Sequence, residues 1–157
     1  MSRHKISLLL NGHPYELEVE SSDTLLKIIR EDLESPATKC SCERGDCGLC
    51  TVLLNGVPVK SCLVLAVEAD GKEITTVDGI SKDGKLSSVQ QAFIEHGAVQ
   101  CGYCTPAFIV AGEAFLKNNP NPTKEEITEA FDGILCRCTG YRQIIDAIMA
   151  ASKIKKK

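Results

Sequence analysis

The stretch Cys-Glu-Arg-Gly-Asp-Cys-Gly-Leu-Cys, residues 42–50, determines how the first half of this chain must fold. It has neither helical nor strand periodicity, so it is predicted to belong to a long wrapping loop from Ser35 to Cys50. Gly45 and Gly48 would let this loop curl tightly and turn backbone N–H groups toward the sulfur atoms. Three thiols in so short a loop indicate a metal site.

The spacing of these three cysteines is C-x4-C-x2-C, and a fourth cysteine lies further along the chain. This arrangement is typical of plant-type ferredoxins, which hold a [2Fe–2S] cluster with four cysteines. Thiolates are soft ligands that suit iron and sulfide. The ligands predicted for a first cluster are Cys42, Cys47, Cys50 and Cys62.

A second group of four cysteines consists of two close pairs, Cys101 with Cys104 and Cys136 with Cys138. Both pairs come at predicted helix starts, where free N–H groups and the positive end of the helix dipole favour thiolates. The group is predicted to hold a second [2Fe–2S] cluster. By spacing alone, two pairs of this kind also fit a tetrahedral zinc site.

Turn signals divide the rest of the first half into strands and one helix. Asn-Gly dipeptides between alternating runs mark two β-hairpins. Apolar residues at helical spacing follow Asp23, an expected N-cap, as far as Asp32. This half is therefore predicted to be an α+β unit. Its predicted strands are residues 5–10, 14–19, 51–54, 57–60 and 73–77.

The second half has helical periodicity only. Thr105 and Thr139 are expected N-caps, and Thr123 with Glu126 forms a capping box. The change of period near residues 79–84 predicts a first domain at residues 1–80 and an all-α four-helix domain at residues 81–157. The predicted helices are residues 88–95, 107–117, a short helix ending at 131, and a last helix containing 144–149.

The composition excludes several classes of protein. There are 18 basic and 21 acidic residues, hence a net charge of −3, and no basic face rich in aromatics, so nucleic acid is not expected as a partner. No apolar run reaches membrane-spanning length, and the N-terminus has no apolar signal core, so a cytoplasmic location without membrane contact is predicted. In such a reducing compartment, nine cysteines are more typical of metal binding than of disulfides.

Three motifs together carry a family resemblance. They are Cys-Glu-Arg-Gly-Asp-Cys-Gly-Leu-Cys-Thr-Val at 42–52, Gln-Cys-Gly-Tyr-Cys-Thr-Pro at 100–106 and Leu-Cys-Arg-Cys-Thr-Gly-Tyr at 135–141. In this order, over nearly the whole chain, they resemble the small iron–sulfur subunits of molybdenum hydroxylases, the xanthine oxidase and dehydrogenase family.

The resemblance implies a fold and a role. The fold is an N-terminal ferredoxin-like β-grasp domain followed by a four-helix domain, each with one [2Fe–2S] cluster. The first cysteine group lies nearer FAD and the second nearer the molybdenum–pterin cofactor, with Gln100 beside the pterin. The chain would relay electrons from a molybdenum-binding large subunit to an FAD-binding medium subunit, in a heterotrimer that can pair into a dimer.

The substrate of such a complex is the partner's property. Residues 85–106 are most similar to bacterial xanthine dehydrogenase small subunits, so a purine hydroxylase is predicted. Nicotinate or other N-heterocycle, aldehyde and carbon monoxide dehydrogenases and hydroxybenzoyl-CoA reductase remain alternatives. A free-standing ferredoxin would need only the first cysteine group, and a zinc-binding interaction module would suit only the second.

The chain departs from the family pattern at Ser41, Leu49, Ala107 and Ile134, of which Ser41 is the most consequential. Ser41 stands where the family usually has glycine, which is unfavourable if the position needs a positive φ. Cys40 is the ninth cysteine and has no family role, so it is predicted to be a bystander thiol, with a substitute ligand or an oxidation site as the alternative.

Overall fold

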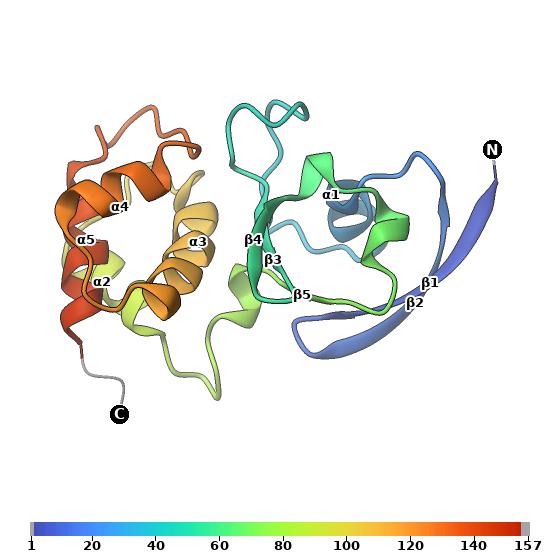
Figure 1. The fold of residues 1–157 in the computed structure, drawn as a ribbon, viewed down its shortest axis with the longest axis horizontal. Coiled ribbons are helices and arrows are strands. Elements are labelled where there is room, and N and C mark those ends of the chain that lie inside the picture. The colour runs from blue at the N-terminus through green and yellow to red at the C-terminus, as the bar shows by residue number, and fades with distance from the viewer. Residues whose placement is uncertain (1, 155–157) are drawn as a thin grey trace.

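Residues 2–154 are described by a computed structural model, in which a mixed β-sheet lies beside a group of helices (Figure 1). The chain passes from the sheet to the helices once, in residues 76–87, and the two parts meet where β3 (Thr51–Leu54) and β4 (Val57–Lys60) face α3 (Thr105–Asn118). In this part of the chain no helix is long and apolar enough to cross a membrane. A mixed sheet followed by helices is the coarse architecture that the sequence predicts.

The sheet has five strands in the order β2-β1-β5-β3-β4. The central strands β1 and β5 are parallel, and the other neighbouring pairs are antiparallel. The long connection between the parallel strands β1 and β5 therefore contains the loop at residues 35–50 and the hairpin formed by β3 and β4. The strands are β1 (Arg3–Leu10), β2 (His13–Glu20), β3 (Thr51–Leu54), β4 (Val57–Lys60) and β5 (Glu73–Thr75).

Both predicted hairpins are confirmed. At the β1–β2 turn, Asn11 and Gly12 have φ values of 53° and 83°, as a two-residue turn with positive φ at both central positions requires. Asn55 and Gly56 repeat the geometry between β3 and β4. The second hairpin matters for function because it returns the chain from Cys50 to the next cysteine.

The helix after β2 is shorter and more irregular than predicted. It is α-helical only at α1 (Leu25–Lys27) and continues as a π-helical turn, Ile28–Asp32. Asp23 does not cap it: its carboxylate accepts from the N–H of Glu20 and from the ammonium of Lys27, while the Thr24 hydroxyl caps the helix. This helix still buries its apolar side against the sheet.

The helical part contains α2 (Ser88–Glu95), α3 (Thr105–Asn118), α4 (Lys124–Phe131) and α5 (Arg142–Lys153). The predicted capping box of Thr123 and Glu126 is confirmed. Two predicted caps are wrong by position. The cap of α3 is Cys104, one residue earlier than Thr105, and that of α5 is Tyr141, with φ of 68°, because Thr139 is engaged with a cysteine sulfur.

The cysteine loop belongs to both parts of the molecule. Leu49 and Cys47 are buried in the same apolar core as Phe93, Phe108 and Ile148 of the helices. On the other side of the loop, β3 packs against α3 through Leu53, Val110 and Ala114, as a second contact between sheet and helices. The sheet and the helices therefore do not have fully separate cores.

A close backbone approach fixes the loop against the segment between α4 and α5. The N–H of Leu135 donates to the carbonyl of Cys47 at 2.9 Å. One residue along, Gly48 has φ of 68°, and a Cβ there would collide with the carbonyl oxygen of Gly133. Glycine is therefore needed at this position for packing as well as for conformation.

This contact yields a stability prediction with a matched control. Gly48→Ala should lower the free energy of unfolding by about 3 kcal/mol, because it adds a backbone collision to the strain of positive φ. Gly56→Ala, with φ of 79° and open space around its Cβ, should cost only about 1 kcal/mol. Denaturant unfolding of both variants tests this, and equal losses would show that Gly133 exerts no constraint.

Candidate metal centres

The first cysteine group is assembled by the β3–β4 hairpin. Cys42 and Cys47 lie in the loop that rises beside the helices in Figure 1, and Cys50 directly precedes β3. Cys62 lies in a 3-10 turn, Ser61–Leu63, directly after β4. Ser61 holds that turn to the loop, since its N–H and its hydroxyl both donate to the carbonyl of Cys50, at 3.3 and 2.7 Å.

Backbone N–H groups make this loop favourable for negative charge. Hydrogen bonds from the N–H groups of Arg44 and Cys47 lower the pKa of Cys42 to about 6, and the Cys47 N to Cys42 Sγ distance is 3.4 Å. Gly45 has φ of 86°, and a Cβ there would lie 2.5 Å from Leu63 Cδ1. The loop thus curls as its two glycines predict, with donors turned toward sulfur.

The other thiols of the group are buried. Burial raises the pKa of Cys62 to about 11, and the adjacent thiol of Cys50 adds to the rise. An unligated buried thiol is therefore protonated at neutral pH, and a metal must displace these protons when it binds. Four sulfur donors with converging N–H groups fit an iron–sulfur cluster, which supplies the positive charge that buried thiolates need.

The second cysteine group joins the start of α3 to the segment between α4 and α5. Cys138 Sγ lies 3.6 Å from Cys101 Sγ and 3.9 Å from Cys136 Sγ. Cys104 lies at the N-terminus of α3, as the sequence predicts. The fold therefore brings together two pairs that are more than 30 residues apart in the chain.

Polar neighbours prepare this group for ligation in a different way. Burial alone would raise the pKa of Cys136, but hydrogen bonds from the hydroxyl and N–H of Thr139 lower it to about 7. The Thr139 Oγ1 to Cys136 Sγ distance is 2.9 Å, and Tyr141 fixes the same residue by accepting its backbone N–H at 2.9 Å. Burial raises the pKa of Cys104 to about 12.

The second group opens to the surface. Cys101 and Cys138 are exposed, Cys136 is half-buried and Cys104 is buried. A cavity of about 340 Å³ is lined by these four cysteines and by Ser41, Cys47, Leu49, Tyr103, Leu135, Arg137 and Tyr141. Because Cys47 belongs to the first group, this cavity touches both predicted sites.

The arrangement of donors bears on the zinc alternative. A tetrahedral zinc site needs four donors around one ion. A [2Fe–2S] cluster makes a different demand, because two of its four thiolates go to each iron. Four sulfur atoms suit either kind of site, so the donor set of each cysteine group does not decide between them.

Cys40 lies against the first group without joining it. It packs beside Cys50 and Cys62, and its thiol donates to the carboxylate of Glu43 at 3.1 Å. Burial, reinforced by the Glu43 hydrogen bond, raises the pKa of Cys40 to about 11. Cys62 and Cys104 are also buried thiols with a raised pKa, so it is the hydrogen bond to Glu43 that sets Cys40 apart and favours the bystander interpretation.

Ser41 does not cause the expected strain. The non-glycine residue with positive φ in this cysteine loop is Glu43, at 52°, and not Ser41. Gln100 lies exposed just before Cys101, so its side chain is accessible to a partner. The structure contains no pterin, and a contact of Gln100 with one stays a prediction.

Sequence reasoning missed several residues that support the two sites. Tyr103 donates from its hydroxyl to the carbonyl of Cys40 at 2.5 Å and so ties the second cysteine segment to the first. Lys60 donates to the carbonyl of Gly45, within the first loop, at 2.6 Å. In the sequence, Tyr103 and Lys60 are marked only by lying close to a cysteine. That closeness does not show whether a side chain donates a hydrogen bond to a cysteine loop or is exposed to solvent.

Comparisons with known proteins agree with this geometry. Residues 8–78 match the 2Fe–2S iron–sulfur cluster binding domain family, and residues 76–149 match a second [2Fe–2S] binding domain family. The spacing of the second cysteine group fits either a zinc site or a [2Fe–2S] cluster, and the second match favours the [2Fe–2S] cluster. Fold, cysteine geometry and both matches define a two-cluster iron–sulfur protein.

The most similar proteins give the particular family. The chain is 48% identical to the nicotinate dehydrogenase small FeS subunit of Eubacterium barkeri, over 96% of each chain. It is 45% identical to the xanthine dehydrogenase iron–sulfur-binding subunit of Escherichia coli O157:H7, over 96% of this chain and 95% of that one. The chain belongs to the small iron–sulfur subunits of the molybdenum hydroxylase family.

A solved structure supports the assignment. A chain of quinoline 2-oxidoreductase from Pseudomonas putida 86 superimposes with a TM-score of 0.91, at 43% identity, over 96% of this chain and 94% of that one. The aldehyde oxidoreductase of Desulfovibrio desulfuricans also matches, with a TM-score of 0.90, but this chain covers only 17% of it. The same fold therefore also occurs as one part of a much longer polypeptide.

The first prediction for the sites separates ligand from bystander. Cys50→Ser should remove about half of the iron per chain, because it deletes one ligand of the first cluster and leaves the second group intact. Cys40→Ser should retain the full iron content. Iron analysis with EPR of both variants tests this, and loss of the first signal in Cys40→Ser would make Cys40 a ligand.

The second prediction concerns thiolate chemistry in the metal-free chain. Cys42 and Cys40 are similarly half-buried, but the pKa of Cys42 is lowered by backbone hydrogen bonds and that of Cys40 is raised by burial, so at pH 7 Cys42 should be mainly thiolate and Cys40 almost entirely thiol. Iodoacetamide should therefore modify Cys42 first, and the rate should fall as the pH drops through 6. Peptide mass spectrometry measures this, and equal rates at the two cysteines would contradict the hydrogen-bond geometry.

Proposed function

We propose that this chain is the electron relay of a molybdenum hydroxylase, passing electrons from a molybdenum–pterin site to FAD. The proposed units are a ferredoxin-like β-grasp domain, residues 1–80, and a four-helix domain, residues 81–157. Cys42, Cys47, Cys50 and Cys62 would hold one [2Fe–2S] cluster, and Cys101, Cys104, Cys136 and Cys138 the other. Each cluster, when bound, supplies one-electron redox chemistry, and the protein supplies position, burial and hydrogen bonding.

The observation that carries the proposal is the junction between the two cysteine groups. The carbonyl of Cys47 accepts from the N–H of Leu135, which is the neighbour of Cys136. One hydrogen bond thus links a residue of the first group to the chain segment of the second. A chain with two such groups in contact is suited to passing electrons between them, which a free-standing ferredoxin with one cluster does not do.

The surroundings of the two groups support different partners for each. Val99, Tyr103 and Leu135 are close to half exposed around the second group, where Cys101 and Cys138 also reach the surface. We assign this apolar rim to the molybdenum-binding large subunit, because exposed apolar groups at a redox site indicate a covered interface. There Gln100 would face the pterin.

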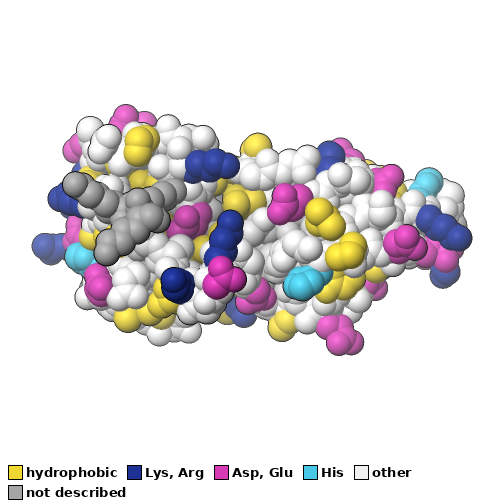
Figure 2. Space-filling view, turned by 90° about the horizontal axis from the view of Figure 1, so that it is seen from below, with side chains coloured by type: hydrophobic (Ala, Val, Ile, Leu, Met, Phe, Trp, Pro, Cys, Tyr) yellow, Lys and Arg dark blue, Asp and Glu magenta, His cyan; other side chains and the backbone are white. Residues whose placement is uncertain are grey.

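The first group has its own exposed apolar side chain. Leu63, which covers Gly45 of the cysteine loop, is 62% exposed. We assign this side to the FAD-binding medium subunit, in a heterotrimer that can pair into a dimer. On the lower face of the molecule, acidic and basic side chains are interspersed with apolar ones (Figure 2).

A cytoplasmic location completes the proposal, supported by nine cysteines without a disulfide.

For the substrate we propose a nitrogen heterocycle, with a purine as the first candidate. Similar proteins are named for nicotinate, nicotine, caffeine and xanthine. Others are named for aldehydes, so an aldehyde is the principal alternative. The small subunit lacks a substrate site of its own in this proposal, so the large subunit must decide among these compounds.

The test uses the purified heterotrimer under anaerobic conditions. Xanthine, hypoxanthine, nicotinate and an aromatic aldehyde are added in turn, and reduction of the two cluster signals is followed by EPR. A purine should reduce both clusters within turnover time, whereas reduction by nicotinate alone would move the substrate to the pyridines. Hydrogen exchange of residues 99–104 should slow on assembly, and unchanged exchange would contradict the assigned interface.

A further inference from the structure

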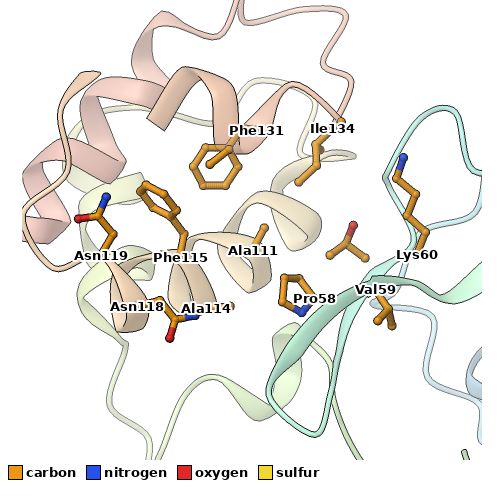
Figure 3. A pocket seen from close by; sticks show the side chains of 13 residues that line it. Pro58, Val59, Lys60, Ala111, Ala114, Phe115, Asn118, Asn119, Phe131 and Ile134 are labelled. Carbon is orange, nitrogen blue, oxygen red and sulfur yellow. The ribbon is translucent and has the colours of Figure 1, made fainter. Parts of the chain in front are cut away.

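Lys60 occupies a particular place between the two parts of the molecule. It is the last residue of β4, two residues before Cys62, and it lines a groove of about 480 Å³ between the β3–β4 hairpin and helices α3 and α4. Figure 3 shows its side chain extending along this groove on the hairpin side, across from Ile134 and Phe131. The side chain thus lies where the β3–β4 hairpin faces the helices.

The ammonium is directed at the first cysteine loop. Its Nζ donates to the carbonyl of Gly45 at 2.6 Å, in a half-buried setting, and Gly45 lies between Cys42 and Cys47. The ammonium is also close to Gly133, where an added Cβ would lie 3.8 Å from Nζ. The loop carbonyl therefore fixes the charge beside the first group, and Gly133 lies three positions before Cys136 of the second.

The charge of Lys60 is not neutralised by a carboxylate in the described part of the chain. The ion pairs within residues 2–154 are Lys27–Asp23, Arg44–Asp46, Lys124–Asp146 and Arg142–Asp146. Each of those cations has its field reduced by a partner. Lys60 has only a neutral carbonyl, so its full positive charge acts on its surroundings, and partial burial in the groove limits screening by water and salt.

We propose that Lys60 raises the reduction potential of the cluster held by Cys42, Cys47, Cys50 and Cys62. This rests on the proposed function. When that cluster takes one electron from the second cluster, its negative charge grows by one, and a fixed cation beside the loop stabilises the reduced form. Lys60 thereby makes the first cluster the favoured resting place of the electron and directs the relay from the second group to the first.

The experiment is an EPR-monitored redox titration of the chain with both clusters. Lys60→Gln removes the charge but can still donate to the Gly45 carbonyl, Lys60→Arg keeps the charge, and Lys60→Met removes charge and donor. Lys5→Gln, on the distant strand β1, controls for the change in net charge. The signal that disappears in Cys50→Ser identifies the first cluster.

Lys60→Gln and Lys60→Met should each lower the equilibrium constant for reduction of the first cluster by about tenfold, or about 59 mV for a one-electron couple. In Lys60→Arg and Lys5→Gln the reduction potential of the first cluster should stay near that of the unmodified chain. In the neutral Lys60 variants the potential of the second cluster should shift less than that of the first. Equal shifts in the arginine and glutamine variants, or none in either neutral variant, would overturn the proposal.

The remaining outcomes are also decisive. Loss of the first signal in both neutral variants, with retention in Lys60→Arg, would assign Lys60 a structural role in holding the loop and overturn the tuning role. Absence of two [2Fe–2S] signals in the unmodified chain would refute the proposed function itself. A normal pair of signals with an unshifted potential would refute only the role of Lys60.

Discussion

The structure depends on one constraint: the first cysteine loop must lie directly against the segment that carries Cys136. This junction allows little freedom. The N–H of Leu135 donates to the carbonyl of Cys47, and Gly48 lies so close to the carbonyl of Gly133 that a Cβ would not fit. Leu49, buried among the helices, fixes the loop from the same side. The sheet and the helices are therefore packed together around the two cysteine groups, and the distance between these groups follows from backbone packing.

Electrostatics explains why each group needs its supporting residues. Thiolates are anionic, and the chain places donors and positive charge near them. Backbone N–H groups donate to Cys42, Thr139 contacts the sulfur of Cys136, and the ammonium of Lys60 lies beside the first cysteine loop. Donors of this kind stabilise sulfur ligands and also influence reduction potentials. In the proposed relay, the same contacts that prepare the metal-free sites for metal would also help to set the direction of electron flow.

Many features of the fold and of the two cysteine groups can be predicted from the sequence because they depend on short stretches of residues. The Asn-Gly turns fix both hairpins, and each cysteine group is defined by short spacings. Thr139 is a misleading local signal, since its hydroxyl serves a sulfur atom and leaves Tyr141 to begin α5. The approach of Gly48 to Gly133 and the position of Lys60 depend on how two distant segments pack, which no local pattern specifies.

The most direct test of the central claim is EPR spin quantitation on the anaerobically purified, dithionite-reduced chain, with iron and zinc measured on the same sample. Two sites of four cysteines each predict about two spins, in two distinguishable [2Fe–2S] signals, with about four irons and no zinc. One spin with about two irons and one zinc would show that the second cysteine group is a structural zinc site, and the relay would be refuted.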